Sequence, residues 1–241
     1  MSVSICRIYP DVLGTYGDGG NAVVLAKRLQ WRGHEAEIVD VRTGDPVPAT
    51  CDLYVLGGGE DDPQTTAANA LAVDNALGRA IDAGAVVFAV CAGYQILGTT
   101  FNGSDGPRPG LGLADWATTT RPRHRPVGEL LVEPSPELEL PTLTGYENHA
   151  SLTVLGPEAR PLGTVASGVG NGDGSEGAIQ GRILGTYMHG PALARNAALA
   201  DLVLSWIVGP LGPLDDEEAE DLRRERIAST RSSRRRWFAR R

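Results

Sequence analysis

The apolar run from Val86 to Val90 limits the fold of this chain more than any other segment. A strand that is apolar at every position is buried on both faces, as in parallel sheets that are covered by helices. The first 100 residues support this assignment, because strand-like and helix-like periodicities alternate along them. We therefore expect an α/β protein with a mostly parallel central sheet and helices on both faces.

Apolar periodicity and glycine positions divide the chain into elements. The predicted strands of the first half are 3–9, 37–41, 53–56 and 86–90, and the predicted helices are 21–32, 67–83, 192–208 and 215–229. Residues 103–145 contain many Pro and Gly and only short extended runs, and further short strands are predicted at 162–167, 178–180 and 183–188. We interpret these segments as a mixed or antiparallel extension of the same sheet. The pattern predicts three parts: a domain over 1–208, a hinge and charged helix over 209–229, and a basic disordered tail over 230–241.

Charge and composition argue against several classes of protein. The net charge of −8 does not favour a nucleic-acid surface as the main function. No apolar run approaches the roughly 20 residues that cross a bilayer, and the N-terminal residues have no signal-peptide pattern. The three cysteines are far apart, and Cys6 and Cys51 are expected to be small buried residues rather than disulfide partners. We expect a cytoplasmic, reduced protein.

The strand at 86–90 leads directly into Cys91, and a helix is predicted to start at Gly93. Ala89, Ala92 and Gly93 are small enough for a sharp strand-to-helix turn that holds a nucleophile at the C-terminal edge of the sheet. A thiol before the positive end of a helix is favoured as the reactive thiolate, and the N–H of Ala92 can stabilise an oxyanion. The segment predicts a nucleophilic cysteine, with a buried cysteine at a strand end as the alternative.

A cysteine nucleophile needs a base, and the chain has four histidines. His34 follows the first helix and is expected at the surface, His124 lies in an Arg- and Pro-rich loop, and His149 follows a strand-like run. His189 ends a predicted strand, so parallel strands would bring it to the same sheet edge as Cys91. We predict His189 as the base, with a capping or core role as the alternative.

Two glycine-rich loops are expected at this edge. In the loop Gly57–Gly59 the N–H of Gly58 can supply a second oxyanion donor, although a plain turn is the alternative. The loop 14–21 matches neither a dinucleotide-binding fingerprint nor a P-loop, so the sequence does not predict ATP binding. The Cys and His spacings match no zinc pattern. We expect neither a metal nor another cofactor.

Several motifs together resemble one family. The segment at 91–95 is similar to the C-x-G-x-Q turn of class I, or triad-type, glutamine amidotransferases, and the segment at 187–191 is similar to the histidine segment of their cobyric-acid-synthase-like branch. Further matches at 16–21, 56–60, 110–113 and 145–149 extend the resemblance over nearly the whole chain, most closely to the glutaminase subunits of lipid II isoglutaminyl synthases. The resemblance implies a flavodoxin-like class I glutamine amidotransferase fold for 1–208.

The resemblance also implies an activity and partners. Cys91 would attack L-glutamine and His189 would act as the base, releasing glutamate and ammonia. The ammonia would pass to a MurT-type ATP-dependent ligase in a heterodimer. That ligase would amidate the α-carboxylate of D-glutamate in lipid II to D-isoglutamine, a step of peptidoglycan synthesis.

Two further residues receive substrate-binding roles from the resemblance. Arg125 would hold the α-carboxylate of glutamine, which suits the bidentate geometry of a guanidinium. Arg121 and Arg123 are alternatives for that role. Gln95 would make a polar contact beside the substrate.

The sequence departs from most of the class after the predicted base. Most class I members carry a Glu two residues after the His, but Pro191 stands there in this chain. The cobyric-acid-like branch that the sequence resembles also lacks this Glu. The hypothesis is that the partner or Glu147 supplies the group that orients His189.

Other functions stay open at this point. The chain could serve another amidotransferase, such as cobyrinic acid a,c-diamide synthase, or be a cysteine hydrolase of the same fold, or a non-catalytic binding module. The basic tail with Trp237 and Phe238 fits either a peripheral contact with an anionic membrane at its inner face or a solubilising role.

Overall fold

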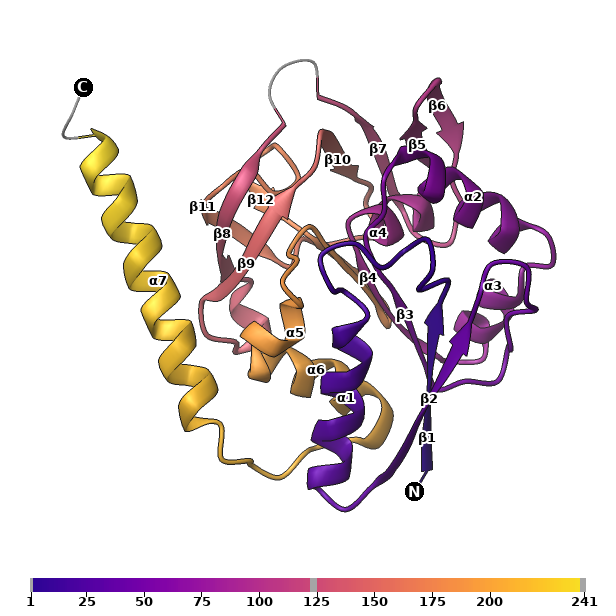
Figure 1. Cartoon of the computed structure of the whole chain (residues 1–241), viewed down its shortest axis with the longest axis horizontal. Helices are drawn as coiled ribbons and strands as arrows, with labels where there is room; N and C mark the ends of the chain where they lie inside the picture. Colours follow the sequence, from indigo (N-terminus) through magenta and orange to yellow (C-terminus); the bar gives the residue numbers. More distant parts are fainter. Residues whose placement is uncertain (1, 122–124, 239–241) are drawn as a thin grey trace.

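A six-stranded sheet with the order β13-β14-β4-β3-β1-β2 forms the centre of the molecule (Figure 1). The computed structural model describes residues 2–121 and 125–238, and their side chains as far as Ser232. Neighbouring strands are parallel except β13 and β14, which are antiparallel. The strands are β1 (Ser2–Ile8), β2 (Glu35–Val41), β3 (Leu53–Leu56), β4 (Val86–Val90), β13 (Ala178–Gln180) and β14 (Ile183–Thr186). The expected α/β fold with a mostly parallel sheet is confirmed.

Helices cover both faces of this sheet (Figure 1). On one face α1 packs against α5 and α6, and on the other α2 packs against α4. The helices are α1 (Gly20–Trp31), α2 (Asp61–Ala72), α3 (Ala76–Asp82), α4 (Ala92–Leu97), α5 (Ala192–Arg195) and α6 (Ala197–Val208). The single helix expected over 67–83 is two helices, because Asn75 adopts a left-handed conformation (φ 50°) between α2 and α3.

The strands β3 and β4 lie in the middle of the sheet, and every residue in them is buried. Complete burial of an aliphatic or aromatic side chain contributes roughly 1.5–3 kcal/mol. The continuous apolar sequence of β4 therefore places it at the centre of the core. This makes β4 a rigid support for the residue that follows it, Cys91.

The strands between α4 and β13 do not extend the central sheet as expected. They form two separate sheets, β10-β7-β5-β6 and β12-β11-β8-β9. Because β13 occupies the edge beside β14, these strands pair with one another instead. Their bounds are β5 (Thr100–Gly103), β6 (Gly106–Pro109), β7 (Trp116–Thr120), β8 (Val127–Pro134), β9 (Leu143–Asn148), β10 (Ser151–Leu155), β11 (Gly163–Ser167) and β12 (Ser175–Glu176), with a short 3₁₀ turn, η1 (Pro136–Leu138).

The segment 209–216 leaves α6 and is fastened to the body by two arginines of the α1 region. Arg28 donates hydrogen bonds to the carboxylates of Asp201 (2.7 Å) and Asp216 (2.7 Å). Arg32 donates to Asp201 and to the carbonyl of Gly212, both at 2.7 Å. The expected hinge is therefore a tethered connection rather than a free linker.

The last helix, α7 (Glu217–Phe238), is longer than expected. It continues beyond Ser229, so the structure has helix over 230–238 where a disordered tail was expected; residues 239–241 lie outside the described residues. Three acidic side chains in the first turn suit the positive end of the helix dipole. No Gly or Pro follows Pro213 to interrupt the helix.

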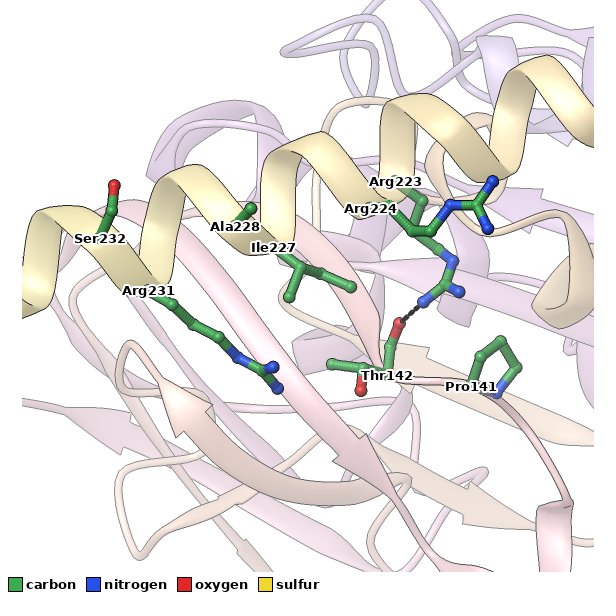
Figure 2. A pocket seen from close by; sticks show the side chains of 8 residues that line it. All are labelled: Pro141, Thr142, Arg223, Arg224, Ile227, Ala228, Arg231 and Ser232. Atoms are coloured by element: carbon green, nitrogen blue, oxygen red, sulfur yellow. Dashed lines mark hydrogen bonds between the residues drawn. The ribbon is translucent and has the colours of Figure 1, made fainter.

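Contacts between α7 and the rest of the molecule are sparse. Arg223 donates to the carbonyl of Thr142 (2.6 Å), and Arg231 reaches Glu133 of β8 (3.3 Å). Figure 2 shows Ile227 and Arg231 extending from the helix toward the sheet across an open groove. The helix thus lies beside the sheet of β8 and β9 (Figure 1) and is packed against it only loosely.

Candidate active site

Cys91 lies in the turn between β4 and α4. Its backbone adopts φ 49° and ψ −105°, a sparsely populated conformation for a residue with a side chain, and such strain costs on the order of 1–3 kcal/mol. The Cys91 N–H donates to the carbonyl of Thr186 (2.8 Å), which fixes the turn against β14. A Cβ on Gly93 would lie 2.6 Å from Cβ of Leu56. The small residues of this segment are therefore a steric requirement of the turn.

His189 reaches the same edge of the sheet as Cys91. The strand β14 runs parallel to β4, with Thr186 beside Val90. Three residues later, the His189 backbone exchanges two hydrogen bonds with Tyr146, at 2.8 and 3.1 Å. The histidine is buried, with 1% of its surface exposed. The structure thus brings together the two residues that the sequence predicts as nucleophile and base.

Asp18 is the carboxylate that contacts His189, and the sequence reasoning missed it. It belongs to the loop between β1 and α1 and has no exposed surface. Its Oδ2 accepts from Nδ1 of His189 (2.8 Å) and from the backbone N–H of Gly58 (2.9 Å). The only sequence signal was an Asp within the glycine-rich segment 16–21, which matches no phosphate-binding motif.

Glu147 does not take this place. Its carboxylate accepts from the backbone N–H groups of Val169 (2.8 Å) and Gly170 (3.0 Å), and Oε2 lies 3.4 Å from Nε2 of His149. These contacts hold the loop before β12 rather than His189. The hypothesis that Glu147 orients His189 is not supported by this geometry.

The electrostatic environment of His189 favours its charged form. Burial alone lowers the pKa of the ring, but interactions with Asp18 and Cys91 outweigh burial and raise the pKa to about 10. The ring nitrogen facing Asp18 is Nδ1, so Nε2 is the nitrogen left for proton exchange. Since a carboxylate can only accept, Nδ1 carries a proton in this arrangement.

A cavity beside Cys91 contains the other predicted substrate residues. It is lined by Gln95 and Arg125 together with Glu60, Gln64 and neighbouring residues. Oε1 of Gln95 accepts from Nε2 of Gln64 (2.9 Å), so the amide group of Gln95 is held in a fixed orientation. The structure therefore brings Cys91, Gln95 and Arg125 to one cavity.

Arg125 is placed where it can meet a ligand that arrives from solvent. Its side chain is 48% exposed, and its guanidinium lies 3.9 Å from the carboxylate of Glu60. Its Nε donates to Oδ1 of Asn148, a contact that orients the guanidinium. Arg121 and Arg123 are the alternatives for the same substrate-binding role. Arg121 is described by the structure, whereas Arg123 belongs to residues 122–124, which lie outside the described residues.

The two predicted oxyanion donors differ in availability. Ala92 begins α4, and the first N–H groups of a helix have no partner within the helix. The N–H of Gly58, in contrast, already donates to Asp18. The expectation that the N–H of Gly58 is a second oxyanion donor is therefore not met, because this N–H is already bonded to the buried carboxylate of Asp18.

Tyr16 packs against His189 and was not predicted as a site residue. Its ring meets that of His189 edge-on, with 4.8 Å between the centroids. Its hydroxyl accepts a hydrogen bond from Nδ2 of Asn148. Asn148 therefore joins Tyr16 on one side to Arg125 on the other.

The remaining histidines lie elsewhere or play other parts. His149 lines the cavity and stacks on Tyr187, with 3.9 Å between ring centroids. His34 lies half-buried between α1 and β2, and His124 lies outside the described residues. Cys6 and Cys51 are buried, as expected, and are not joined by a disulfide.

Comparison with known proteins agrees with this geometry. Residues 4–197 match the family model of the CobB/CobQ-like glutamine amidotransferase domain. Subunit GatD of lipid II isoglutaminyl synthase (glutamine-hydrolyzing) from Staphylococcus aureus is 32% identical over 207 residues, which cover 84% of this chain and 83% of that protein. The subunit of the same name from Streptococcus pneumoniae is 32% identical over 82% of this chain and 77% of its own length. A solved glutamine amidotransferase shares the fold with a TM-score of 0.60 at 19% identity, over 84% of this chain and 98% of its own.

Proposed function

This chain belongs to the CobB/CobQ-like glutamine amidotransferase family, and on that premise we propose that it is the glutaminase subunit of a lipid II isoglutaminyl synthase. It hydrolyses L-glutamine to glutamate and ammonia. The observation that carries the proposal is the meeting of Cys91, at a strained strand-to-helix turn, with the buried His189 beside a cavity that also contains Arg125. The relatives of similar length named above support the same assignment.

The catalytic cycle follows from these positions. The thiol proton of Cys91 passes to Nε2 of His189, and the thiolate attacks the γ-amide carbon of glutamine. The N–H of Ala92 stabilises the oxyanion. The imidazolium then gives its proton to the departing ammonia, and the neutral ring activates water to release glutamate from the sulfur.

Arg125 and Gln95 fix the substrate in this proposal. The guanidinium of Arg125 binds the α-carboxylate of glutamine by paired, charge-assisted hydrogen bonds. Gln95, oriented by Gln64, provides a polar contact close to Cys91. Both residues line the cavity beside Cys91, so their two contacts together would orient the amino acid.

The ammonia serves a partner. The sequence contains no P-loop, so the carboxylate to be amidated is activated elsewhere, by a MurT-type ATP-dependent ligase that forms a heterodimer with this chain. Its acceptor is the α-carboxylate of D-glutamate in lipid II. Ammonia passed directly between the subunits escapes protonation in bulk water.

A cytoplasmic reaction at the inner face of the membrane fits this substrate. None of the described helices is long and apolar enough to span a bilayer. The Arg-rich end of the chain, with Trp237 and Phe238, provides a peripheral contact with anionic lipid in this proposal. Flotation with anionic vesicles should weaken for a chain that ends at Ser229, and unchanged flotation would exclude this role.

The glutaminase assignment is tested by ammonia release from glutamine, by the chain alone and with a MurT-type ligase. The wild type should release ammonia and Cys91→Ala should release none, although both bind the ligase equally. Alkylation by a glutamine analogue should label Cys91 of the wild type and should be slowed by glutamine. Turnover by Cys91→Ala, or wild-type protein that neither turns over glutamine nor is labelled, would exclude the assignment.

A further inference from the structure

The start of α1, directly after the loop that carries Asp18, is locked against the segment that carries His189. Oδ1 of Asn21 accepts from the N–H of Leu193 (2.9 Å). A Cβ on Gly20 would lie 2.6 Å from Cγ of Pro191, so the first turn of α1 and Pro191 are in close contact. Pro191, at the place where most of the class carry a Glu, therefore belongs to the surface that fixes the end of the Asp18 loop.

The same loop is fitted to the glycines at the end of β3. The N–H of Thr15 donates to the carbonyl of Gly58 (3.1 Å). A Cβ on Gly57 would lie 2.1 Å from the carbonyl oxygen of Leu13, and one on Gly58 would lie 3.1 Å from Oδ2 of Asp18. The glycines at 57 and 58 thus allow the loop to approach closely enough for its carboxylate to reach the histidine.

We propose that Asp18 is the positioning residue that completes the Cys91–His189 pair from within this chain. Its carboxylate holds the ring in the tautomer with a proton on Nδ1, so that Nε2 can take the thiol proton of Cys91. Asp18 keeps its hydrogen bond to Nδ1 while Nε2 gains and loses that proton. This inference rests on the proposed glutaminase, and it makes an orienting carboxylate from the partner unnecessary.

The asymmetry of the Asp18 carboxylate supports this role. Oδ2 makes both hydrogen bonds, to His189 and to Gly58, whereas Oδ1 is buried and has no partner among the described residues. A fully buried carboxylate is costly unless a positive group compensates for it. The compensating group here is the protonated ring of His189, the same ring that exchanges protons with Cys91.

Asp18→Asn is the decisive variant because it is nearly isosteric. The carbonyl oxygen of Asn can take the place of Oδ2 and accept from both Gly58 and His189. The amide nitrogen then takes the place of the unpartnered Oδ1. The variant keeps the shape and removes the negative charge. Asp11→Asn, an exposed change in the same segment, is the matched control.

The first readout is alkylation of Cys91 by iodoacetamide as a function of pH, which does not depend on glutamine. With the Asp18 carboxylate hydrogen-bonded to its ring, the imidazolium of His189 supports a reactive thiolate of Cys91. In Asp18→Asn this low-pH reactivity should fall by about tenfold or more, and Asp11→Asn should match the wild type. In a His189→Gln background, Asp18→Asn should cause no further change, because it acts through the ring.

The second readout is glutamine turnover by the complex with the ligase. We expect kcat of Asp18→Asn to fall by about 10²- to 10⁴-fold with KM little changed. The proposal would be overturned if Asp18→Asn had the kcat and the alkylation profile of the wild type. It would also be overturned if adding the ligase restored the alkylation profile of Asp18→Asn fully to that of the wild type.

If the wild type does not hydrolyse glutamine but the alkylation profile still depends on Asp18, the glutaminase assignment fails and the positioning role stands. If Asp18→Asn does not fold, Asp18→Glu provides the test: it retains the charge, so its low-pH reactivity should exceed that of His189→Gln, and equality would overturn the proposal.

Discussion

At the scale of single residues, the reactive groups differ in their access to solvent. His189 and Asp18 are almost fully buried, so their charges are only weakly screened. Burial disfavours the charged ring, yet Asp18 and Cys91 raise the pKa of His189 to about 10. A ring that is protonated at neutral pH is suited to protonate a leaving ammonia. Arg125 is about half exposed, which is compatible with the proposed contact with the α-carboxylate of glutamine.

Replacement of Arg125 by Gln should separate binding from chemistry. The loss of charge-assisted hydrogen bonds to the α-carboxylate costs about 1.5–3 kcal/mol, which corresponds to a rise in the KM for glutamine of roughly 10- to 100-fold. The value of kcat should change little, because Cys91 and His189 are untouched. Steady-state kinetics would check this, with Arg160→Gln as the control at a surface ion pair to Glu137. A fall in kcat at unchanged KM would contradict the assigned role.

At the scale of elements, two arginines hold the connection from α6 to α7, and the buried guanidinium of Arg28 makes most of the contacts. The side chain of Arg28 is 4% exposed and bonds two carboxylates, those of Asp201 and Asp216. The arginine keeps two like charges together and ties the segment 209–216 to α1. Because α7 itself contacts the body sparsely, its position follows from this tether.

Arg28→Ala should release this connection. The two carboxylates would lose the cation that they share, leaving Asp201 paired with Arg32 and Asp216 without its partner. Removal of one member of such a largely buried cluster costs roughly 3 kcal/mol. We expect faster hydrogen exchange in the connection and in the first turns of α7, with little change over β3 and β4. Arg7→Ala, which breaks the more exposed pair with Asp40, should leave these segments unchanged. Equal exchange in both variants would show that α7 is held by other contacts.

The elements that could be predicted from the sequence are those whose signal is local. The run Val86–Val90 and the small residues around Cys91 are contiguous in the sequence. The buried strand, the sharp turn and the place of Cys91 at the C-terminal end of that strand therefore follow from neighbours in the chain. Asp18 could not be predicted, because its partner His189 is 171 residues away and its role depends on how two loops pack. The two additional sheets were missed for the same reason, since the choice of a strand's partner is not encoded in its own period.

At the scale of the whole molecule, the central sheet and the smaller sheet that contains β12 meet at a buried acid. Glu176 of β12 has no exposed surface, and its Oε1 accepts from the hydroxyl of Thr186 (2.9 Å) and the N–H of Tyr187 (2.7 Å). Thr186 ends β14, directly beside β4. The carboxyl thus fixes β12 to the strand that leads to His189.

The titration of Glu176 should appear in the stability of the whole chain. Burial raises its pKa to about 7, above the value of 4.5 for an unfolded chain. A group with a raised folded pKa contributes stability that is fully present below pH 4.5 and is lost as the pH rises through 7. The wild type should therefore lose stability between about pH 5 and pH 8, by on the order of 3 kcal/mol.

Glu176→Gln isolates this contribution. The amide keeps an acceptor for Thr186 and Tyr187 but does not titrate, so the pH-dependent loss should disappear. With roughly 2–4 °C of Tm per kcal/mol for a chain of this size, the difference in Tm between wild type and variant should change by roughly 5–10 °C from pH 5 to pH 8. Thermal unfolding at several pH values measures it, and Glu158→Gln, at an exposed glutamate, should follow the wild type. Parallel curves for wild type and Glu176→Gln would mean that the buried carboxyl is ionised throughout, and the junction of the sheets would then need a cation to balance it.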